Sequence, residues 1–310
     1  MTKMQASISS RNVKSAAGLG IVALMCLAVS AGHIAAAPRP SDPGSAAESV
    51  TRVEVALDAS ADAALITREG ETRDALGFPV GVKRAGHHVV DGFENAEYDE
   101  VTELDSAGNV ESVTQFDSKG RLLGAVRVDA APVTGLRVAQ DGAVKSAQRS
   151  VVAAGLAVGT PTSTEADQAT GGWTVHWTRT QDGVRVRGDE TRVQVWPDGR
   201  IQSVARSEHD LAAAPASRIG SATARQIAGA NLDRWFAGRN SGYTIQKVDL
   251  EWVGPNAAFD PARINGVEAP YRLAWVTEVK PSGDAANDVW LMSLFVDAGD
   301  GTVIGGDFVE

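Results

Sequence analysis

The C-terminal half of the chain alternates apolar and polar residues in short runs that are typical of β-strands. In WTVHWTR, the apolar Trp173, Val175 and Trp177 fall on one side and polar residues on the other. The run VDLEWV, from Val248, shows the same alternation. The run WLMSLFV, from Trp290, is largely apolar on both sides, which indicates a central strand, although a short buried helix also fits.

Two segments that precede these strands have the period of a helix. In AVKSAQRSVVAAGLAV and in SATARQIAGANLDRWF, small and apolar residues return about every 3.6 positions, and Ser221 is suited to cap the second helix. Each helix comes before its own group of strands. The pattern therefore predicts an α+β fold with two tandem units of one helix packed on an antiparallel sheet, over residues 139–212 and 217–310.

The two predicted units look like copies of one supersecondary element. Trp173, Val175 and Trp177 match Tyr271, Leu273 and Trp275, and the turns Asp198-Gly199 and Asp300-Gly301 end similar strands. Two unrelated hairpins with common turn residues remain the alternative interpretation.

Residues 53–138 are predicted to form an N-terminal β-rich region. Between Tyr98 and Asp129, short β-rich runs are separated by turns, and Asp105 and Gly108 recur twelve residues later as Asp117 and Gly120. One strand and one turn account for that spacing, so an antiparallel meander is expected. The pattern of residues 53–95 predicts no definite fold.

The N-terminus has the features of a secretory signal peptide. A basic, acid-free start is followed by an apolar run from Ala16 to Gly32 and by small residues up to Pro38. An uncleaved anchor is the alternative, but the run is shorter than the ~20 residues that span a bilayer. We expect residues 1–37 to be removed by cleavage near Ala37, residues 38–52 to be a flexible leader, and the mature protein to be secreted or in the cell envelope, outside the membrane.

The composition excludes several classes of protein. Cleavage removes three basic residues and no acid, which leaves 26 basic and 39 acidic residues and a net charge of −13. That charge argues against nucleic acid as a partner. Cleavage also removes Cys26, the single cysteine, so the mature chain has no disulfide. Because small units without such links have little stability of their own, the two C-terminal units should pack against each other.

Two stretches resemble a known family. GGWTVHWTRTQDGVRVRGDETRVQVWPDGRIQSV, and YRLAWVTEV followed by WLMSLFVDAGDGTVIGGDF, are similar to the PepSY propeptide domain and to propeptides of thermolysin-like secreted proteases. The resemblance covers about residues 139–310 and implies a PepSY/cystatin-like fold, with a helix across an antiparallel sheet. It brings no catalytic residue. Propeptides of this kind inhibit their protease and help it to fold. In such a precursor the protease follows the propeptide, whereas this sequence stops at Glu310, so we expect a stand-alone copy that acts on a separate protein.

Catalytic motifs are scarce. The mature chain has four histidines and none starts a His-Glu-x-x-His motif, which excludes the common zinc protease site. Ser207–Asp210 place a hydroxyl, an imidazole and acids in a row, but neighbours on an extended segment point in opposite directions, so a solvated loop is the preferred interpretation. His87-His88 fit a surface pair better than a metal site. We predict no catalytic residue, no metal, no cofactor and no enzymatic activity.

One charged feature suggests a docking surface. Six arginines and four acids lie between Gly171 and Arg206, within an otherwise acidic chain. The candidate partner-binding residues are His176, Arg185, Arg187 and Arg192, expected on the exposed face of the first sheet, since arginine is enriched at interfaces. An ordinary solvated strand face is the alternative.

The expected function is a secreted, non-enzymatic PepSY-like protein that binds a protein partner. A protease is the favoured partner, and the protein would act on it as a propeptide-like inhibitor or a folding assistant. The alternative is a cell-envelope module that binds a wall polymer or a small ligand.

Overall fold

The structure is a computed structural model. It describes residues 52–56, 63–91, 96–128, 135–156, 158–168, 170–238, 240–256, 258, 269–287 and 289–309. The predicted signal peptide and its cleavage site near Ala37 lie outside these residues.

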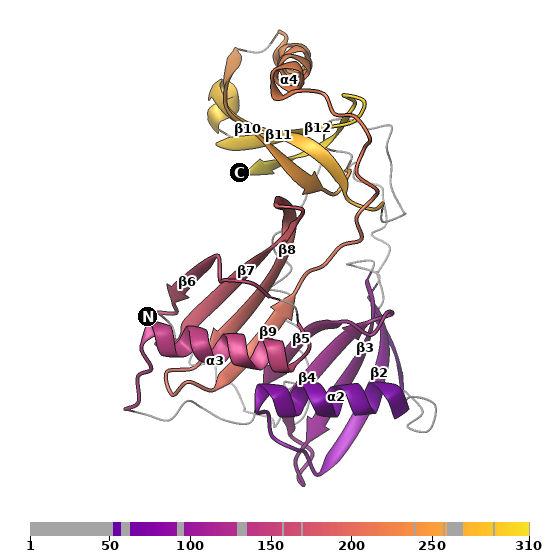
Figure 1. Ribbon diagram of the computed structural model, residues 1–310, viewed down its shortest axis with the longest axis vertical. Helices are drawn as coiled ribbons and strands as arrows, with labels where there is room; N and C mark the ends of the chain where they lie inside the picture. Colours follow the sequence, from indigo (N-terminus) through magenta and orange to yellow (C-terminus); the bar gives the residue numbers. More distant parts are fainter. Residues whose placement is uncertain are drawn as a thin grey trace, which may run out of the picture.

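Three units with the same order of elements follow one another along the chain (Figure 1). Each begins with one helix and continues with four strands. The first contains α2 (Ala63–Leu76), β2 (Lys83–Asp91), β3 (Ala96–Leu104), β4 (Val110–Asp117) and β5 (Leu122–Arg127), and β1 (Arg52–Ala56) pairs with β2. The second contains α3 (Gln140–Ala153), β6 (Ser163–Ala166), β7 (Trp173–Gln181), β8 (Val184–Val195) and β9 (Ile201–Arg206). The third contains α4 (Ser221–Phe236), β10 (Ser241–Val253), β11 (Arg272–Gly283), the short 3-10 helix η1 (Asp284–Asn287), β12 (Leu291–Asp297) and β13 (Val303–Val309).

The strands form two antiparallel sheets that meet at one point. In the first, β1 to β5 continue through β9 and β8 to β7 and β6, so the first two units share one sheet. In the second, β10 to β13 follow in order. Within the described residues, a single parallel bridge between Val186 of β8 and Trp252 of β10 joins the sheets. The predicted α+β fold with an antiparallel sheet and the predicted meander, seen here as β3, β4 and β5, are confirmed.

Helix α2 is an element that the apolar pattern did not predict. Its buried residues have helical spacing, but three of the five are polar: Leu65, Glu69, Thr72, Arg73 and Leu76. A helix whose inner face carries a carboxylate and a guanidinium shows no apolar period. For this reason residues 53–95, for which the pattern predicts no definite fold, contain a helix within the region expected to be β-rich.

One core lies under both α2 and α3. It combines side chains from the two helices with those of the shared sheet, among them Leu65, Phe116, Ala147, Val151 and Trp177. Figure 1 shows the two helices on the same face of that sheet. The first two units therefore form one continuous layer of helices over one sheet.

The second and the third unit each contain the same tryptophan hydrogen bond, which supports the predicted internal repeat. The Trp173 indole donates to the carbonyl of Val138, two residues before α3, at 3.0 Å. The Trp275 indole donates to the carbonyl of Ile219, two residues before α4, also at 3.0 Å. The repeat thus aligns Trp275 with Trp173. The sequence match of Trp275 to Trp177 was wrong by four residues, because alternation along a strand fits equally well after any even shift.

Backbone contacts repeat in the same register. The amide of Val138 donates to the carbonyl of Pro197 at 2.7 Å, and that of Ile219 donates to the carbonyl of Ala298 at 2.8 Å. Each acceptor lies in the turn after the third strand of its unit. Both helix starts are therefore held between the second strand and the last hairpin.

The third unit packs against the end of β8. Val184 and Val186 extend past the shared sheet and join a cluster with Trp252, Tyr271 and Leu273 of the third unit. The expectation that these two units pack together is confirmed.

Asn256 covers the outer edge of β13. Its backbone amide donates to the carbonyl of Ile304 at 2.9 Å, and its side-chain amide both donates to the carbonyl of Gly306 and accepts from the amide of Gly306. Asn256 thus makes, through its backbone amide and its side chain, the bonds that a neighbouring strand would make at this point.

Candidate functional site at the junction of the three units

The structure places the predicted partner-binding residues in different surroundings. His176 lies opposite Arg192 in the pairing of β7 with β8, on the face away from α3, and both approach Glu190. The Arg192 guanidinium lies 2.6 Å from the Glu190 carboxylate, and His176 Nδ1 lies 3.8 Å from it. Arg185 is exposed near the β7–β8 hairpin.

Arg187 lies between the second and third units. Its guanidinium donates to Asp307 at 2.8 Å, to Glu251 at 3.2 Å and to the Ser293 hydroxyl at 3.3 Å, and it sits 5.5 Å from the centre of the Phe295 ring. The expectation that Arg187 lies on an exposed sheet face is wrong, because β8 runs beyond its own sheet and the third unit covers this residue. Its role is to hold the two units together.

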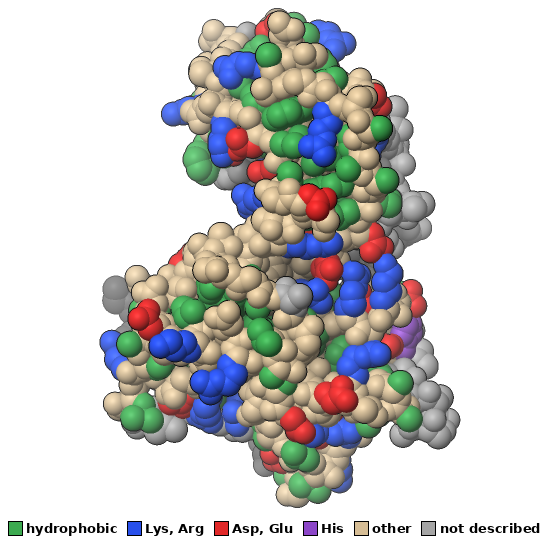
Figure 2. All heavy atoms as spheres, in the orientation of Figure 1, with side chains coloured by type: hydrophobic (Ala, Val, Ile, Leu, Met, Phe, Trp, Pro, Cys, Tyr) green, Lys and Arg blue, Asp and Glu red, His purple; other side chains and the backbone are tan. Residues whose placement is uncertain are grey.

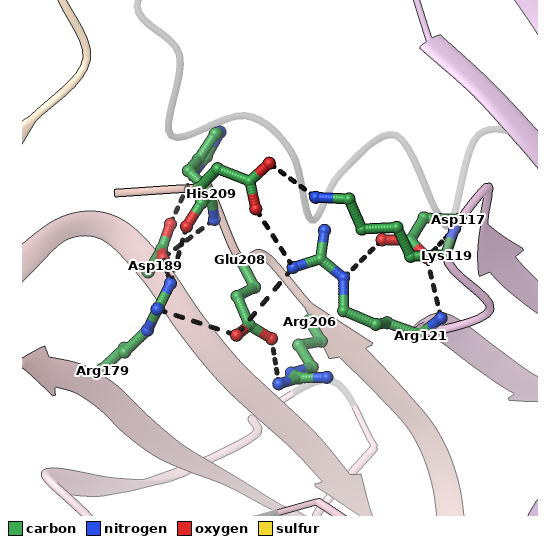
Figure 3. A network of polar contacts seen from close by, with 9 residues as sticks. Asp117, Lys119, Arg121, Arg179, Asp189, Arg206, Glu208 and His209 are labelled. Carbon is green, nitrogen blue, oxygen red and sulfur yellow. Dashed lines mark hydrogen bonds and ion pairs between the residues drawn. The ribbon is translucent and has the colours of Figure 1, made fainter. Parts of the chain in front are cut away.

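Residues 207–212, which lead from the second unit to the third, are fixed by charged side chains (Figure 3). Glu208 approaches Arg121, Arg179 and Arg206, and Asp210 approaches Arg121 at 3.9 Å and Lys119 at 2.6 Å. Lys119 and Arg121 come from the β4–β5 hairpin of the first unit. As expected of a loop, residues 207–210 have no regular secondary structure and are half-exposed or exposed. They are also held in place, because Lys119 and Arg121 of the first unit contact Glu208 and Asp210.

His209 lies on the opposite side of the same segment, as the extended backbone predicts (Figure 3). Its Nδ1 lies 2.5 Å from Oδ1 of Asp189, whose side chain is fully buried, and its backbone amide donates to Oδ2 of Asp189 at 3.0 Å. Arg179 donates both to Asp189 and to the carbonyl of His209, each at 2.8 Å. Buried Asp189 thus accepts bonds from three directions and fixes the imidazole.

Tyr271 of the third unit completes this contact. Its ring stacks on the His209 imidazole with centroids 4.2 Å apart, and its hydroxyl lies 3.4 Å from Nε2. The backbones of Asp210 and Ala212 bond the amide and the carbonyl of Tyr271. An Asp–His pair can activate a hydroxyl nucleophile, but the hydroxyl here is a buried phenol beneath a stacked ring. This geometry suits a joint between units.

A hollow of about 370 Å³ opens where the three units meet. Its lining is Arg121, Arg179, Gln181, Asp182, Glu208, His209, Asp210, Leu211, Ala212, Ala214 and Trp252. Most of its charged side chains are engaged with one another in the contacts above. Figure 2 shows charged side chains gathered at the level where the third unit meets the other two.

Sequence reasoning named His209 but missed its partners. Asp189 lies twenty residues away and Tyr271 sixty-two, and no local motif connects them. The signal that was available is the alternation of Glu208, His209 and Asp210, which places the acids on one side and the imidazole on the other.

His87 and His88 do not converge on one site. They are neighbours on β2, where His87 pairs with Glu100 and His88 with Asp99. The hydrogen bond from His88 Nδ1 to Asp99, at 2.8 Å, raises the pKa of His88. Among the described residues, no group of three His, Cys, Asp or Glu side chains could hold a metal ion, and no helix there is long and apolar enough to cross a membrane.

Comparisons with known proteins give a likeness of structure. No family model matches the chain, and a search of curated proteins finds no match. Among solved structures, the chain is similar to the Bacillus megaterium YpeB C-terminal domain, with 12% sequence identity and a TM-score of 0.41. The match covers 79% of this chain and 97% of that one.

Proposed function

We propose that the protein is a secreted, non-enzymatic PepSY-like protein that binds a protease as a propeptide-like inhibitor or folding assistant. The observation that supports this most is the threefold repeat of one helix followed by an antiparallel sheet, the arrangement implied by the PepSY resemblance of residues 139–310. The junction supports it further, because its charged side chains bind each other and serve to join units.

Arg185, His176 and Arg192 are the residues that we propose for docking. Arg185 is exposed, and His176 and Arg192 are half-buried on the sheet face away from α3. Arg187 is left out, because its guanidinium is committed to the third unit.

The test uses purified residues 38–310, titrated into the secreted proteases of the source organism while peptide hydrolysis is followed. Saturable inhibition of one protease, or a higher yield when that protease refolds, supports the proposal. R185E and R192E should weaken the effect, whereas R149E, on the exposed side of α3, should leave it unchanged. If neither inhibition nor assisted refolding occurs with any of the proteases, the proposal fails.

A second candidate function is a cell-envelope module that binds a wall polymer. It is favoured by one residue, Trp290, which is 61% exposed just before β12. Exposed aromatic rings offer a flat apolar surface with a polar edge. Sedimentation with purified cell walls tests it: the chain should pellet and W290A should stay in solution, and a wild-type chain that stays wholly in solution removes this candidate.

A further inference from the structure

Four charged side chains meet between α2 and the strands beneath it. Glu69, Arg73 and Glu103 are buried there, and Arg84 reaches them from the surface. Glu69 and Arg73 come from α2, Arg84 from β2 and Glu103 from β3. Arg73 and Arg84 contact Oε1 of Glu103 at 3.0 and 2.6 Å, and the amide of Gly81 donates to its Oε2 at 2.9 Å. The two arginines and this amide therefore satisfy Glu103 well.

Glu69 is much less well satisfied, although it is more deeply buried. Its exposed fraction is 0%, and neither of its oxygens accepts a hydrogen bond from the described residues. The nearest cations are Arg84 at 3.3 Å and Arg73 at 3.7 Å, and both are already bonded to Glu103. A buried carboxylate without hydrogen bonds strongly favours its neutral form.

The groups around Glu69 also favour its neutral form. Burial raises the pKa of Glu69 from its ordinary value of 4.5 to about 7, Arg84 opposes the rise, and the like charge of Glu103 adds to it. A proton also turns Glu69 into a donor, and the carboxylate of Glu103 is the acceptor beside it.

The remaining neighbours supply no better partner. From β4, Ser112 lies opposite Glu103 in the register and is neutral. On α2, Asp74 is largely exposed and binds Arg73 at 3.0 Å. The charged side chains of α3 are exposed: Asp141, Lys145 and Arg149.

We propose that Glu69, Arg73, Arg84 and Glu103 form a proton-dependent clasp, which holds α2 firmly on β2 and β3 when Glu69 is protonated and less firmly when it is ionised. The direction in which stability changes with pH follows from the coupling between proton binding and folding. An acid with a higher pKa in the folded state than in the unfolded state binds its proton more tightly when folded, so the stability that it confers is complete at low pH. That stability is lost as the pH rises from about 4.5 to about 7.

The experiment compares the unfolding of three chains over residues 38–310: wild type, E69Q and E71Q. Glu71 lies on the exposed side of the same helix, so E71Q makes the same chemical change without touching the clasp. The equilibrium constant for opening of α2 is measured from the hydrogen exchange of its amides between pH 5 and 8.5. One linked proton changes that constant by about tenfold per pH unit.

The ratio of this constant in wild type to that in E69Q should rise by up to about tenfold per unit up to pH 7 and then level off. The ratio of the wild-type constant to that of E71Q should not change with pH. A wild-type to E69Q ratio that does not change with pH overturns the proposal.

A second measurement needs no substitution at Glu69. The carboxyl carbon of Glu69, followed by NMR in the wild-type chain, should titrate with a midpoint near 7, and E103Q should lower that midpoint because the like charge is gone. A wild-type midpoint at the ordinary value near 4.5 would show that the clasp does not exist, whether or not E69Q folds.

Discussion

Trp173 and Trp275 make the same hydrogen bond in successive units. Each indole donates, at 3.0 Å, to the carbonyl two residues before its helix. The bond ties the second strand of the unit to the start of its helix, where backbone groups lack helical partners. The two residues therefore align the second and third units and fix the register of the repeat.

Because Trp173 and Trp275 are equivalent, removing either hydrogen bond should lower the stability by the same amount. W173F and W275F keep an aromatic ring but remove the donor, and each should lower the free energy of unfolding by about 1 kcal/mol, because a partly buried carbonyl loses its partner. W290F, at an exposed site, should change it very little. Urea unfolding measures all three, and a negligible loss in W173F or W275F would contradict the assigned role.

A second prediction concerns the contact between the second and third units. R187M leaves Glu251 and Asp307 without their shared cation, which should cost about 2 kcal/mol. Limited proteolysis should then cut the connection at 211–217 faster than in wild type. R185M, two residues away and exposed, serves as the control, and equal cleavage of the two variants would show that Arg187 does not hold the units.

A third prediction concerns the joint at His209. D189N weakens the charged bonds to Arg179 and His209, so the stability should fall by about 2 kcal/mol. Hydrogen exchange of residues 207–212 should quicken in the same variant. K119A removes an ion pair between two exposed side chains and should have a much smaller effect. Unchanged exchange in D189N would argue against Asp189 as the anchor of this segment.

A fourth prediction concerns Tyr243. Burial raises the pKa of its hydroxyl to about 12, and the hydrogen bond to Asp233, at 2.7 Å, adds to the rise. The folded state therefore keeps the phenol proton longer than the unfolded state, and stability should fall as the pH rises from about 10 to about 12. Ultraviolet titration of wild type against Y243F isolates this group, and a midpoint near 10 would disprove the shift.

The sequence predicted the elements whose inner faces are apolar. Helices α3 and α4 and the strand at Trp173 follow the expected periods, because small and apolar residues face the core there. Helix α2 was missed because Glu69 and Arg73 occupy its inner face. An apolar period cannot reveal a helix that is held by charges.

The junction could not be predicted from local patterns. Its members come from the β4–β5 hairpin, β7, β8, the connecting segment and the third unit, and chain topology alone brings them together. Arg185 and Arg187 illustrate the limit. Alternation correctly places them on one side of β8, but it gives no information on which of them a later unit will cover.

The amide of Asn256 has a consequence for how other chains can approach. Open sheet edges are templates on which a foreign strand can add by β-augmentation. Since Asn256 occupies the amide and carbonyl of Gly306 and the carbonyl of Ile304, an incoming strand would have to displace it before it could extend the sheet at β13. Strand addition at Ile304 and Gly306 is therefore opposed by contacts that the chain already makes with itself.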